Sequence, residues 1–373
     1  MSVFLSTAFL LPFTVSLLVS WGIVWTRHWH GRYSFDSLSG VQKVHIGQVP
    51  RIGGMAIFLG FCSADIFLSN GAQSILNPLL LLGLIAFSFG LLEDLTKQVS
   101  VTMRLWATMI PGVVGYFLTG YTLNQFGYGW LDLLLSWPIV SIAFTAFAIC
   151  GVTHAMNMID GFNGLSAWVT VWILLGIIGM ALSVDDVHLA SVALFLLAST
   201  AGFLLVNWPW GKLFLGDGGS YFLGVSIAWL CVVLVSRNPQ ISPFACLVLC
   251  SYPIIEVLYS IARRAKARMS SGKPDQLHLH QLIAKSFLYP RLKGRFSPVQ
   301  KNSITGFVVS TFSIASLVLA VTFAQSQSSL IACFGVLVLL YIALYQRVRT
   351  ISAAQRSKEH AHASESMPSG LPD

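Results

Sequence analysis

The chain has 373 residues, of which 55% are hydrophobic and only 10% are charged, and its mean hydropathy is +0.74. This composition excludes a soluble globular protein and indicates an integral membrane protein. The formal net charge of +8 does not suggest nucleic acid as a partner, because a protein beside an anionic membrane leaflet carries basic residues for topological reasons.

Apolar runs of about 20 residues are long enough to cross the ~30 Å hydrocarbon core of a bilayer. We expect about eleven such spans, at 3–25, 53–70, 78–93, 103–120, 130–150, 165–183, 188–206, 218–236, 242–262, 305–325 and 328–346. Backbone groups in lipid must be bonded within their own helix, which excludes sheet outside the loops. The predicted fold class is an all-α polytopic membrane protein with one transmembrane domain over 1–350 and a polar, disordered tail at 351–373.

The basic residues sort cleanly between the two ends of these spans. Every Lys and Arg except Arg237 falls in 26–52, 94–104, 207–217, 263–304 or the tail from 347. By the positive-inside rule this face is cytoplasmic. We therefore expect the N-terminus outside, the C-terminus inside, and a cytoplasmic-face cleft roofed by 263–304.

The first cytoplasmic connection ends in HIGQVPRIGG, residues 45–54. Pro50 sets a turn, and Gly53 and Gly54 allow close backbone approach. Arg51 offers a planar fork suited to phosphate. The alternative is that Arg51 serves topology alone.

The stretch GLLEDLTKQ, residues 90–98, places Glu93 beside Asp94. Adjacent carboxylates repel one another unless a cation or a proton lies between them. Mg²⁺ shared with substrate phosphates suits such a pair. Neutralisation by Lys97, one helical turn on, is the alternative.

The stretch NMIDGFNGLS, residues 157–166, spaces Asn157, Asp160 and Asn163 three apart, with Gly161 and Gly164 between and after them. If the segment is helical, Asn157 and Asp160 lie on nearby faces. The glycines let a planar group come close, and an amide both donates and accepts hydrogen bonds.

The stretch FLGDGGSYFLG, residues 214–224, puts Asp217 at the predicted start of a span. An aspartate there can cap the helix. The backbone N–H groups of the same helix start would equally receive a phosphate.

The stretch PDQLHLHQL, residues 274–282, spaces His278 and His280 two apart. The thiolates and the third ligand of a typical zinc site are missing nearby. Imidazole N–H groups that contact an anion are the preferred interpretation, and a loop without a role for either ring is the alternative.

Taken together and in this order, the five stretches resemble the cytoplasmic motifs of the polyprenyl-phosphate N-acetylhexosamine-1-phosphate transferases (glycosyltransferase 4 type). The resemblance runs from about residue 45 to 283. It implies a Mg²⁺-dependent reaction, with Mn²⁺ as a substitute, in which a UDP-N-acetylhexosamine and polyprenyl (undecaprenyl) phosphate give polyprenyl-diphosphate-N-acetylhexosamine and UMP. Such a reaction initiates lipid-linked cell-surface polysaccharides. Whether the chain works as a monomer or a homodimer stays open.

The resemblance also implies a role for each motif residue. Those implied to be catalytic are Glu93, Asp94 and Asp217, with Asp217 and Asp94 as metal ligands. Those implied to line the nucleoside pocket are Asn157, Asp160 and Asn163, with Phe214 as the aromatic ring on which uracil stacks. Those implied to contact the diphosphate are His278 and His280, with Arg51 as a helper.

Three positions depart from the family pattern. Glu93 stands where the family usually has Asp, Asn163 replaces a frequent second Asp, and Gln281 replaces a frequent third histidine. The last departure places the chain closer to the GlcNAc-1-phosphate transferase branch than to the phospho-MurNAc-pentapeptide transferase.

A polytopic transporter of an anionic solute is the alternative function. Carriers place polar residues near the bilayer midplane. Here only Asp65 and Glu256 lie within predicted spans, whereas the acids of the motifs gather on one face, which favours a surface active site.

Overall fold

The computed structural model describes residues 2–36, 48–267 and 277–365, and this part of the chain is helical, with no strand and one isolated bridge between Phe35 and Pro50. The first half comprises α1 (Ser2–Trp25), α2 (Arg27–Ser34), α3 (Gly54–Cys62), η1 (Ser63–Phe67), α4 (Asn70–Thr96), α5 (Val101–Thr119), α6 (Gly129–Leu135), α7 (Pro138–Ile159) and α8 (Leu165–Ser183). The second half comprises α9 (Val187–Asn207), α10 (Gly216–Arg237), α11 (Pro243–Leu249), α12 (Ser251–Lys266), α13 (Leu279–Ile283), the π-helix η2 (Ala284–Leu288), α14 (Tyr289–Arg291), α15 (Pro298–Ser310), α16 (Phe312–Thr322) and α17 (Gln327–Glu365).

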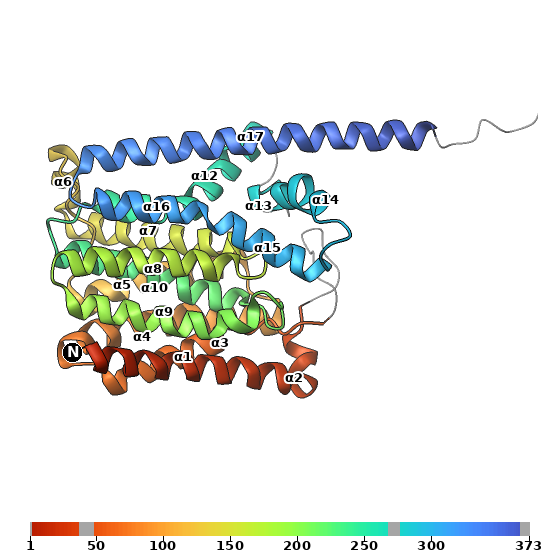
Figure 1. Cartoon of the computed structure of the whole chain (residues 1–373). Helices are drawn as coiled ribbons and strands as arrows, with labels where there is room; N and C mark the ends of the chain where they lie inside the picture. Colours follow the sequence, from red (N-terminus) through yellow and green to blue (C-terminus); the bar gives the residue numbers. More distant parts are fainter. Residues whose placement is uncertain (1, 37–47, 268–276, 366–373) are drawn as a thin grey trace, which may run out of the picture.

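The predicted polytopic membrane fold is confirmed. Among the described residues, eight helices are long and apolar enough to cross a membrane, and two bent pairs raise that number to ten. The remaining predicted run, 53–70, is a shorter apolar helix over Gly54–Ile66. The long helices lie side by side in one bundle (Figure 1).

The chain bends sharply at two places, one of which lies inside the predicted span 242–262. The chain bends by 86° between α1 and α2 and by 75° between α11 and α12. The second break follows from Pro253, which has no N–H with which to continue the hydrogen-bond ladder from α11. The predicted boundaries near 150 are also corrected, because α7 continues to Ile159 and carries Asn157 on its last turn.

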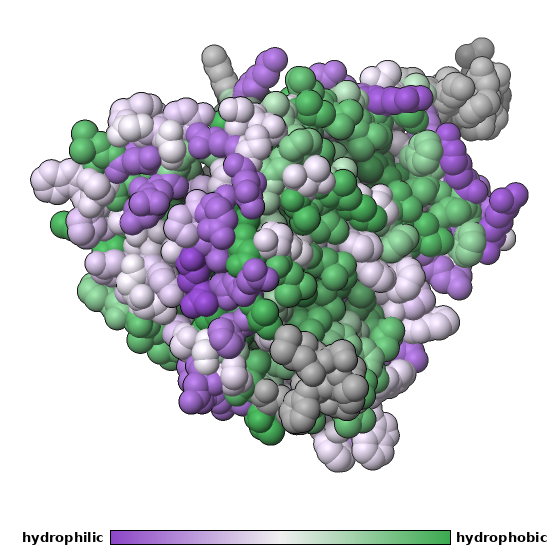
Figure 2. Space-filling view, turned by 60° about the vertical axis from the view of Figure 1, so that its left-hand side comes forward, coloured by the Kyte–Doolittle hydropathy of each residue, from purple (hydrophilic) through white to green (hydrophobic). Residues whose placement is uncertain are grey.

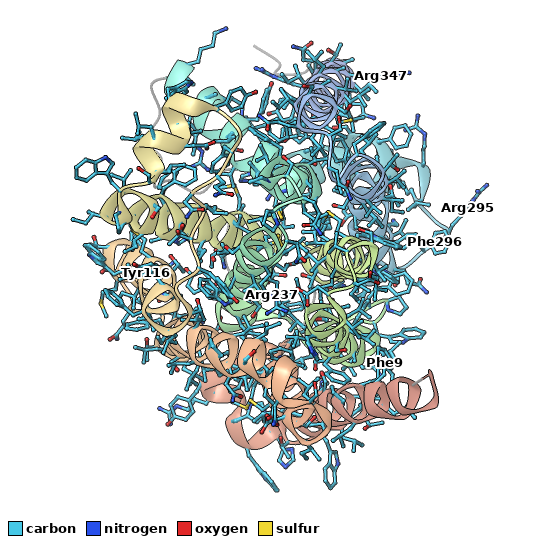
Figure 3. All side chains as sticks on the ribbon, turned by 90° about the vertical axis from the view of Figure 1, so that its left-hand side faces the viewer. Phe9, Tyr116, Arg237, Arg295, Phe296 and Arg347 are labelled. Carbon is cyan, nitrogen blue, oxygen red and sulfur yellow. The ribbon has the colours of Figure 1, made fainter. Side chains whose placement is uncertain are left out.

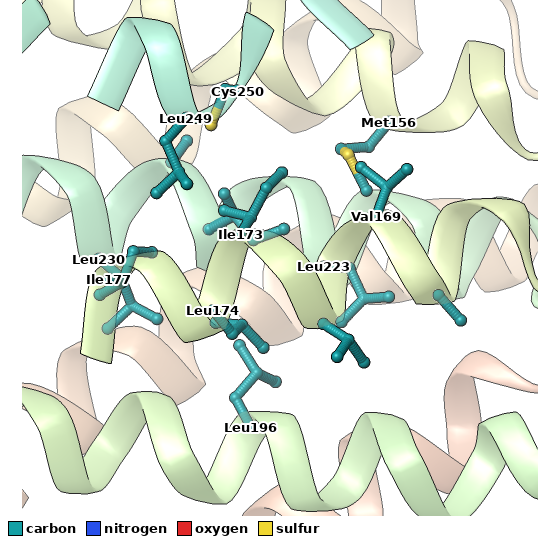
Figure 4. Packing of buried hydrophobic residues seen from close by; sticks show 14 of the residues in the cluster. Met156, Val169, Ile173, Leu174, Ile177, Leu196, Leu223, Leu230, Leu249 and Cys250 are labelled. Atoms are coloured by element: carbon teal, nitrogen blue, oxygen red, sulfur yellow. The ribbon is translucent and has the colours of Figure 1, made fainter. Parts of the chain in front are cut away.

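Helix α10 forms the centre of the bundle. In its membrane-crossing window 94% of the residues are buried, and it packs chiefly against α4 and α7. Leu223 and Leu230 of α10 lie beside Ile173 and Ile177 of α8 in the apolar core, which Figure 4 shows from close by. Burial on all sides explains why α10 shows no polar face of its own.

The visible flank of the bundle is apolar and the end beside it is more polar. Figure 2 shows a broad hydrophobic flank beside a hydrophilic end face, as expected of a protein surrounded by lipid. The N-terminus lies at one end of the bundle, and α2, α13 and α14 lie at the other (Figure 1). The predicted motifs gather at the end that carries α2, α13 and α14.

At the opposite end of the bundle, Arg237, the one basic residue predicted there, forms an ion pair with Asp186. Arg237 lies near the middle of the bundle when it is viewed from this end (Figure 3), and its Nε donates to Asp186 Oδ2 at 2.8 Å. Burial raises the pKa of Asp186, but bonds from Arg237, the Leu189 N–H and Asn238 outweigh burial and hold that pKa below its ordinary value. This ion pair fastens the α8–α9 connection to the end of α10.

The domain boundary at residue 350 stays a prediction, and α17 continues past that residue to Glu365. Residues 351–365, expected to be disordered, are helical. Residues 366–373 of the predicted tail lie outside the described part of the chain, as do residues 45–47 and 274–276 of the first and last motifs.

Candidate active site

Segment 50–54 and the start of α10 are held together through their backbones. The Phe214 N–H donates to Pro50 O at 2.8 Å, the Gly53 N–H to Phe214 O at 2.9 Å, and the Gly54 N–H to Leu215 O at 2.9 Å. Two motifs more than 150 residues apart in the sequence therefore lie side by side. This pairing brings Arg51 to the N-terminus of α10.

Asp94 caps helix α10 from the end of α4. Its Oδ1 accepts the Asp217 N–H at 2.9 Å and its Oδ2 accepts the Gly218 N–H at 2.8 Å. The first N–H groups of a helix have no partner within the helix, and a negative charge there is favourable. These two donors are thus occupied by a carboxylate, so the structure decides against the expectation that they receive a phosphate.

Asp217 receives two side-chain donors on one oxygen. Arg51 Nη2 lies 2.6 Å from Asp217 Oδ1, and Asn157 Nδ2 donates to the same oxygen at 3.0 Å. Asn157 also donates to Ser220 Oγ at 2.8 Å. The last turn of α7, the first turn of α10 and Arg51 therefore meet at one carboxylate.

Arg51 is the cation at the centre of an acidic cluster. Besides Asp217, its Nε lies 3.3 Å from Asp94 Oδ1, and its Nη1 lies 3.7 Å from Asp36 Oδ1. Burial lowers the pKa of the Arg51 guanidinium, but Asp217, Asp94 and Asp36 outweigh burial and raise it above its ordinary value. Arg51 therefore stays charged and partly neutralises the cluster.

Asp36 is a member of this cluster that sequence analysis missed. The Asp36 N–H donates to Val49 O at 3.0 Å, and the Arg51 N–H donates to Ser34 O at 2.8 Å. These bonds bring the two ends of the first connection together beside α10. The available signal was that Asp36 is one of the few acids on the predicted cytoplasmic face and shares a connection with Arg51.

Asp160 follows α7 at its C-terminal cap position. Burial raises the pKa of Asp160 to about 7, Arg51 opposes this shift, and the charges of Asp217 and Asp36 add to it. Because the charges of Asp217 and Asp36 contribute to this shift, Asp160 lies within electrostatic reach of both. Asp160 thus belongs to the same cluster.

Glu93, the residue that precedes Asp94, has other partners than the cluster. Its Oε2 accepts the Val99 N–H at 2.8 Å, and its Oε1 forms an ion pair with Arg104 of α5. The structure therefore divides the Glu93–Asp94 pair: Asp94 joins the Asp217 cluster, whereas Glu93 closes the α4–α5 turn. The cation that pairs with Glu93 is Arg104 rather than Lys97.

Asn163 contacts α15. Its backbone N–H donates to Asn302 Oδ1 at 2.7 Å, and its Nδ2 donates to Ser303 Oγ at 3.2 Å. In this arrangement Asn163 anchors the α7–α8 turn. Phe214 is half-buried, and its backbone is fixed against segment 50–54.

The predicted histidine pair packs against the α7–α8 turn. The rings of His278 and His280 stack, with centroids 5.4 Å apart and planes 3° from parallel. The His280 ring meets Phe162 edge to face at 5.5 Å. Burial lowers the pKa of His280 to about 4, so this ring is neutral at physiological pH. The α12–α15 connection therefore reaches the turn that follows Asp160.

The two acids within predicted spans are held by the protein itself. Asp65 lies in η1 and accepts from Gln73 Nε2 at 3.1 Å. Glu256 is fully buried and accepts from Tyr341 and His278. Neither acid within the predicted spans therefore supports the alternative of a carrier.

The acidic cluster suits a divalent cation by its charge. Asp36, Asp94, Asp160 and Asp217 surround a single guanidinium, and Asp217 Oδ2 has no hydrogen bond among the described residues. Within the described ranges, no three His, Cys, Asp or Glu side chains are arranged to hold a metal by themselves. Mg²⁺ is commonly held by one or two carboxylates and completed by substrate phosphates, so the donor set fits such a site.

An apolar cavity opens between α7, α10, α11 and α12. Its volume is about 370 Å³, and its lining runs along α7 from Phe144 to Ala155 and includes Ile254 and Leu258 of α12. Ala155 precedes Asn157 by two residues. The cavity therefore lies along the part of α7 that precedes Asn157.

Comparison with known proteins shows which proteins this chain is similar to. The model of glycosyl transferase family 4 matches residues 76–235. A Bacillus subtilis (strain 168) protein named "Probable undecaprenyl-phosphate N-acetylglucosaminyl 1-phosphate transferase" is 29% identical over 286 residues, covering 74% of this chain and 75% of its own. The Escherichia coli (strain K12) protein named undecaprenyl-phosphate alpha-N-acetylglucosaminyl 1-phosphate transferase is 26% identical, covering 66% and 68%. The decaprenyl-phosphate N-acetylglucosaminephosphotransferase of Mycobacterium tuberculosis (strain ATCC 25618 / H37Rv) is 25% identical, covering 65% and 67%. The chain is thus similar to glycosyl transferase family 4 over residues 76–235 and to polyprenyl-phosphate N-acetylglucosamine-1-phosphate transferases over about two thirds or more of its length.

Proposed function

We propose that this protein transfers N-acetylhexosamine-1-phosphate, with UDP-N-acetylglucosamine or a related UDP-sugar as the donor, to polyprenyl phosphate and releases UMP. The names of the relatives, which specify undecaprenyl or decaprenyl phosphate and N-acetylglucosamine, support this assignment.

The observation that carries the proposal is the position of the acidic cluster. Asp94, Asp217 and Arg51 meet at the end of a bundle with an apolar flank. A lipid phosphate reaches such a place from the bilayer, and a nucleotide sugar reaches it from the aqueous side. The apolar cavity beside α7 would hold part of the lipid chain.

In the proposed step, a phosphate oxygen of the lipid attacks the phosphorus that carries the sugar. A new P–O–P bond forms between the lipid phosphate and this phosphorus. The bond from this phosphorus to the bridging oxygen of the donor diphosphate breaks, and UMP leaves with the bridging oxygen. A phosphate monoester has its second pKa near ~6, so it is largely a dianion at neutral pH. The acceptor therefore needs positioning more than it needs a general base.

Asp217, with Asp94 beside it, would hold Mg²⁺ together with the donor diphosphate. The bound ion would neutralise charge on the phosphates and polarise the bond that breaks. Asp94 fixes the first turn of α10 and thereby places Asp217, and Arg51 offers a second cation to the phosphates once it leaves the carboxylates.

The α7–α8 turn would receive the donor's uridine, with Phe214 as the stacking ring. Asn157 and Asp160 would contribute hydrogen bonds there, whereas Asn163 would act by holding the turn against α15. The histidine pair would contact the diphosphate from above this turn.

The active site would face the cytoplasm of a cell whose inner membrane holds the protein. The N-terminus lies at the opposite end of the bundle from the site and would be outside, in accord with the distribution of basic residues. The proposed reaction needs only one copy of the chain, so a homodimer stays a prediction from the sequence.

Detergent-purified protein supplied with undecaprenyl phosphate, Mg²⁺ and a panel of UDP-N-acetylhexosamines tests the proposal through UMP release. We expect release that requires the lipid, stops when EDTA is added, and returns with Mg²⁺ or Mn²⁺. Asp217→Asn should abolish it, and the matched control Asp65→Asn, an exposed acid outside the cluster, should not. Folded protein that releases no UMP with any donor would contradict the proposal.

A further inference from the structure

Glu256 is a fully buried carboxylate outside the acidic cluster. It lies in α12 and receives three donors from two other parts of the chain. Its Oε1 accepts from His278 Nδ1 at 3.0 Å and from the Leu279 N–H at 3.3 Å, and its Oε2 accepts from the Tyr341 hydroxyl at 2.8 Å. A buried charge with this many matched donors is satisfied rather than strained.

These contacts fix the tautomer of His278. The three donors match an ionised carboxylate, which can only accept, so Nδ1 of His278 carries the proton directed at Glu256. Ser260 Oγ lies 3.3 Å from the same nitrogen and restricts the ring further. Nε2, on the other edge of the ring, makes no hydrogen bond within the described ranges and is left for another group.

The His278 ring is also fixed in position relative to the active site. It stacks on His280, which in turn packs on Phe162. An added methyl group on Gly161 would lie 3.3 Å from His280 Nε2. His278 is therefore held, through Glu256 and His280, over the turn that directly follows Asp160.

We propose that Glu256 is the positioning residue of the reaction: it holds His278 with Nε2 turned to the donor diphosphate and stabilises this ring when Nε2 carries a proton. The inference rests on the proposed function. A neutral Nε2 would present a lone pair to an anion, whereas a protonated Nε2 donates a hydrogen bond to it. Because the Nδ1 proton stays bonded to Glu256, a second proton on the ring lies on Nε2, where it can be donated to the diphosphate.

Three substitutions separate positioning from support of the fold. In Glu256→Gln the amide oxygen faces His278 and Leu279, because the Leu279 N–H requires an acceptor there. The amide NH₂ of the glutamine then donates to the Tyr341 oxygen. This variant removes only the charge. Glu256→Leu removes both the charge and the hydrogen bonds. The matched control Tyr341→Phe removes one hydrogen bond to the same carboxylate and leaves the contact with His278 intact.

For UMP release we expect Glu256→Gln to lower kcat by about 10- to 100-fold with KM for the UDP-sugar unchanged. Glu256→Leu should lower kcat further, and Tyr341→Phe should match the wild type. Thermal unfolding in detergent shows which variants are folded. A wild-type kcat in Glu256→Gln, or an equal loss in Tyr341→Phe, would overturn the inference.

A second measurement does not depend on turnover. Protein labelled with ¹⁵N-histidine, with the His278 signals identified by their loss in His278→Gln, reports which ring nitrogen carries the proton. We expect the proton on Nδ1 in the wild type and in Glu256→Gln, and no fixed tautomer in Glu256→Leu. A wild-type ring protonated only on Nε2 would refute the role of Glu256 even if UMP release is seen. Absence of UMP release with the expected spectrum would instead refute the proposed function.

Discussion

A single methyl group at Gly90 should separate the two carboxylates on which the site depends. In Gly90→Ala the new methyl would lie 2.5 Å from Asp217 O and 2.6 Å from Gly218 Cα, whereas ordinary contact begins at 3.4 Å. These are backbone atoms, so α4 must withdraw from α10 by roughly 1 Å. Asp94 is one helical turn further along α4, and its bonds of 2.9 and 2.8 Å to the start of α10 would lengthen to about 3.8 Å, beyond hydrogen-bond range.

We expect Gly90→Ala to lower kcat/KM for UMP release by about 100-fold, the scale of a misplacement of roughly 1 Å, and to lower the free energy of unfolding by about 1–3 kcal/mol. Gly335→Ala is the matched control, since Gly335 also lies inside a crossing helix, α17, and has nothing within 4 Å of its added methyl. It should keep wild-type activity and lose no stability, because alanine favours helix over glycine. Wild-type kinetics in Gly90→Ala would refute the idea that close α4–α10 contact sets the geometry of Asp94.

Substitution of the adjacent acids should give different results: Asp94→Asn should lower kcat for UMP release by about 100-fold, whereas Glu93→Gln, which loses its ion pair with Arg104, should mainly lower the melting temperature. Equal kinetic losses in both would contradict this division. The pKa of Asp160 is about 7 in the folded protein against an ordinary value of 3.8. At a pH between these two pKa values, the folded protein therefore keeps a proton on Asp160 that the unfolded chain has released. Stability should therefore fall as the pH rises through this window and level off above about pH 7, and Asp160→Asn should show less of that decline when melting temperatures are compared from pH 5 to pH 8. Arg237→Ala at the opposite end should cost about 1–3 kcal/mol of unfolding free energy without changing UMP release. Because the pKa of Asp186 is lowered in the folded protein, the stability from the Arg237–Asp186 ion pair is lost as the pH falls through that lowered pKa. Melting temperatures measured in acid will show this loss. If Arg237→Ala has the same acid profile as the wild type, the ion pair is not the source of that stability.

The crossing helices could be predicted because the length of an apolar run is a local property. The eleven predicted runs all contain helix, and the motifs fall at one end as the basic residues indicated. The bend at Cys250 was missed although Pro253 carried the signal. The composition of the 242–262 run predicts a single span, because composition contains no information about a change in the direction of the chain.

The division between Glu93 and Asp94 could not be predicted because it depends on rotation. Consecutive residues on a helix point about 100° apart, so one carboxylate faces α10 while its neighbour faces α5. Asp36 was missed for a related reason, since its place beside Arg51 rests on backbone bonds between the ends of one long connection. The role of Glu256 was not predicted because its partners, His278 and Tyr341, are 22 and 85 residues away.

The cap on α10 limits how this site can bind phosphate. In a membrane helix the backbone N–H groups free to bind a ligand are those of the first turn, since all others are bonded within the helix. Asp94 occupies the N–H groups of Asp217 and Gly218, so a phosphate has to be bound by side chains and by a cation instead. Side chains borne on α4, α7, α10 and segment 50–54 keep their relative positions only while those elements stay packed. The small residues at these contacts, Gly90 of α4 among them, are therefore as much a condition of the chemistry as the carboxylates that they bring together.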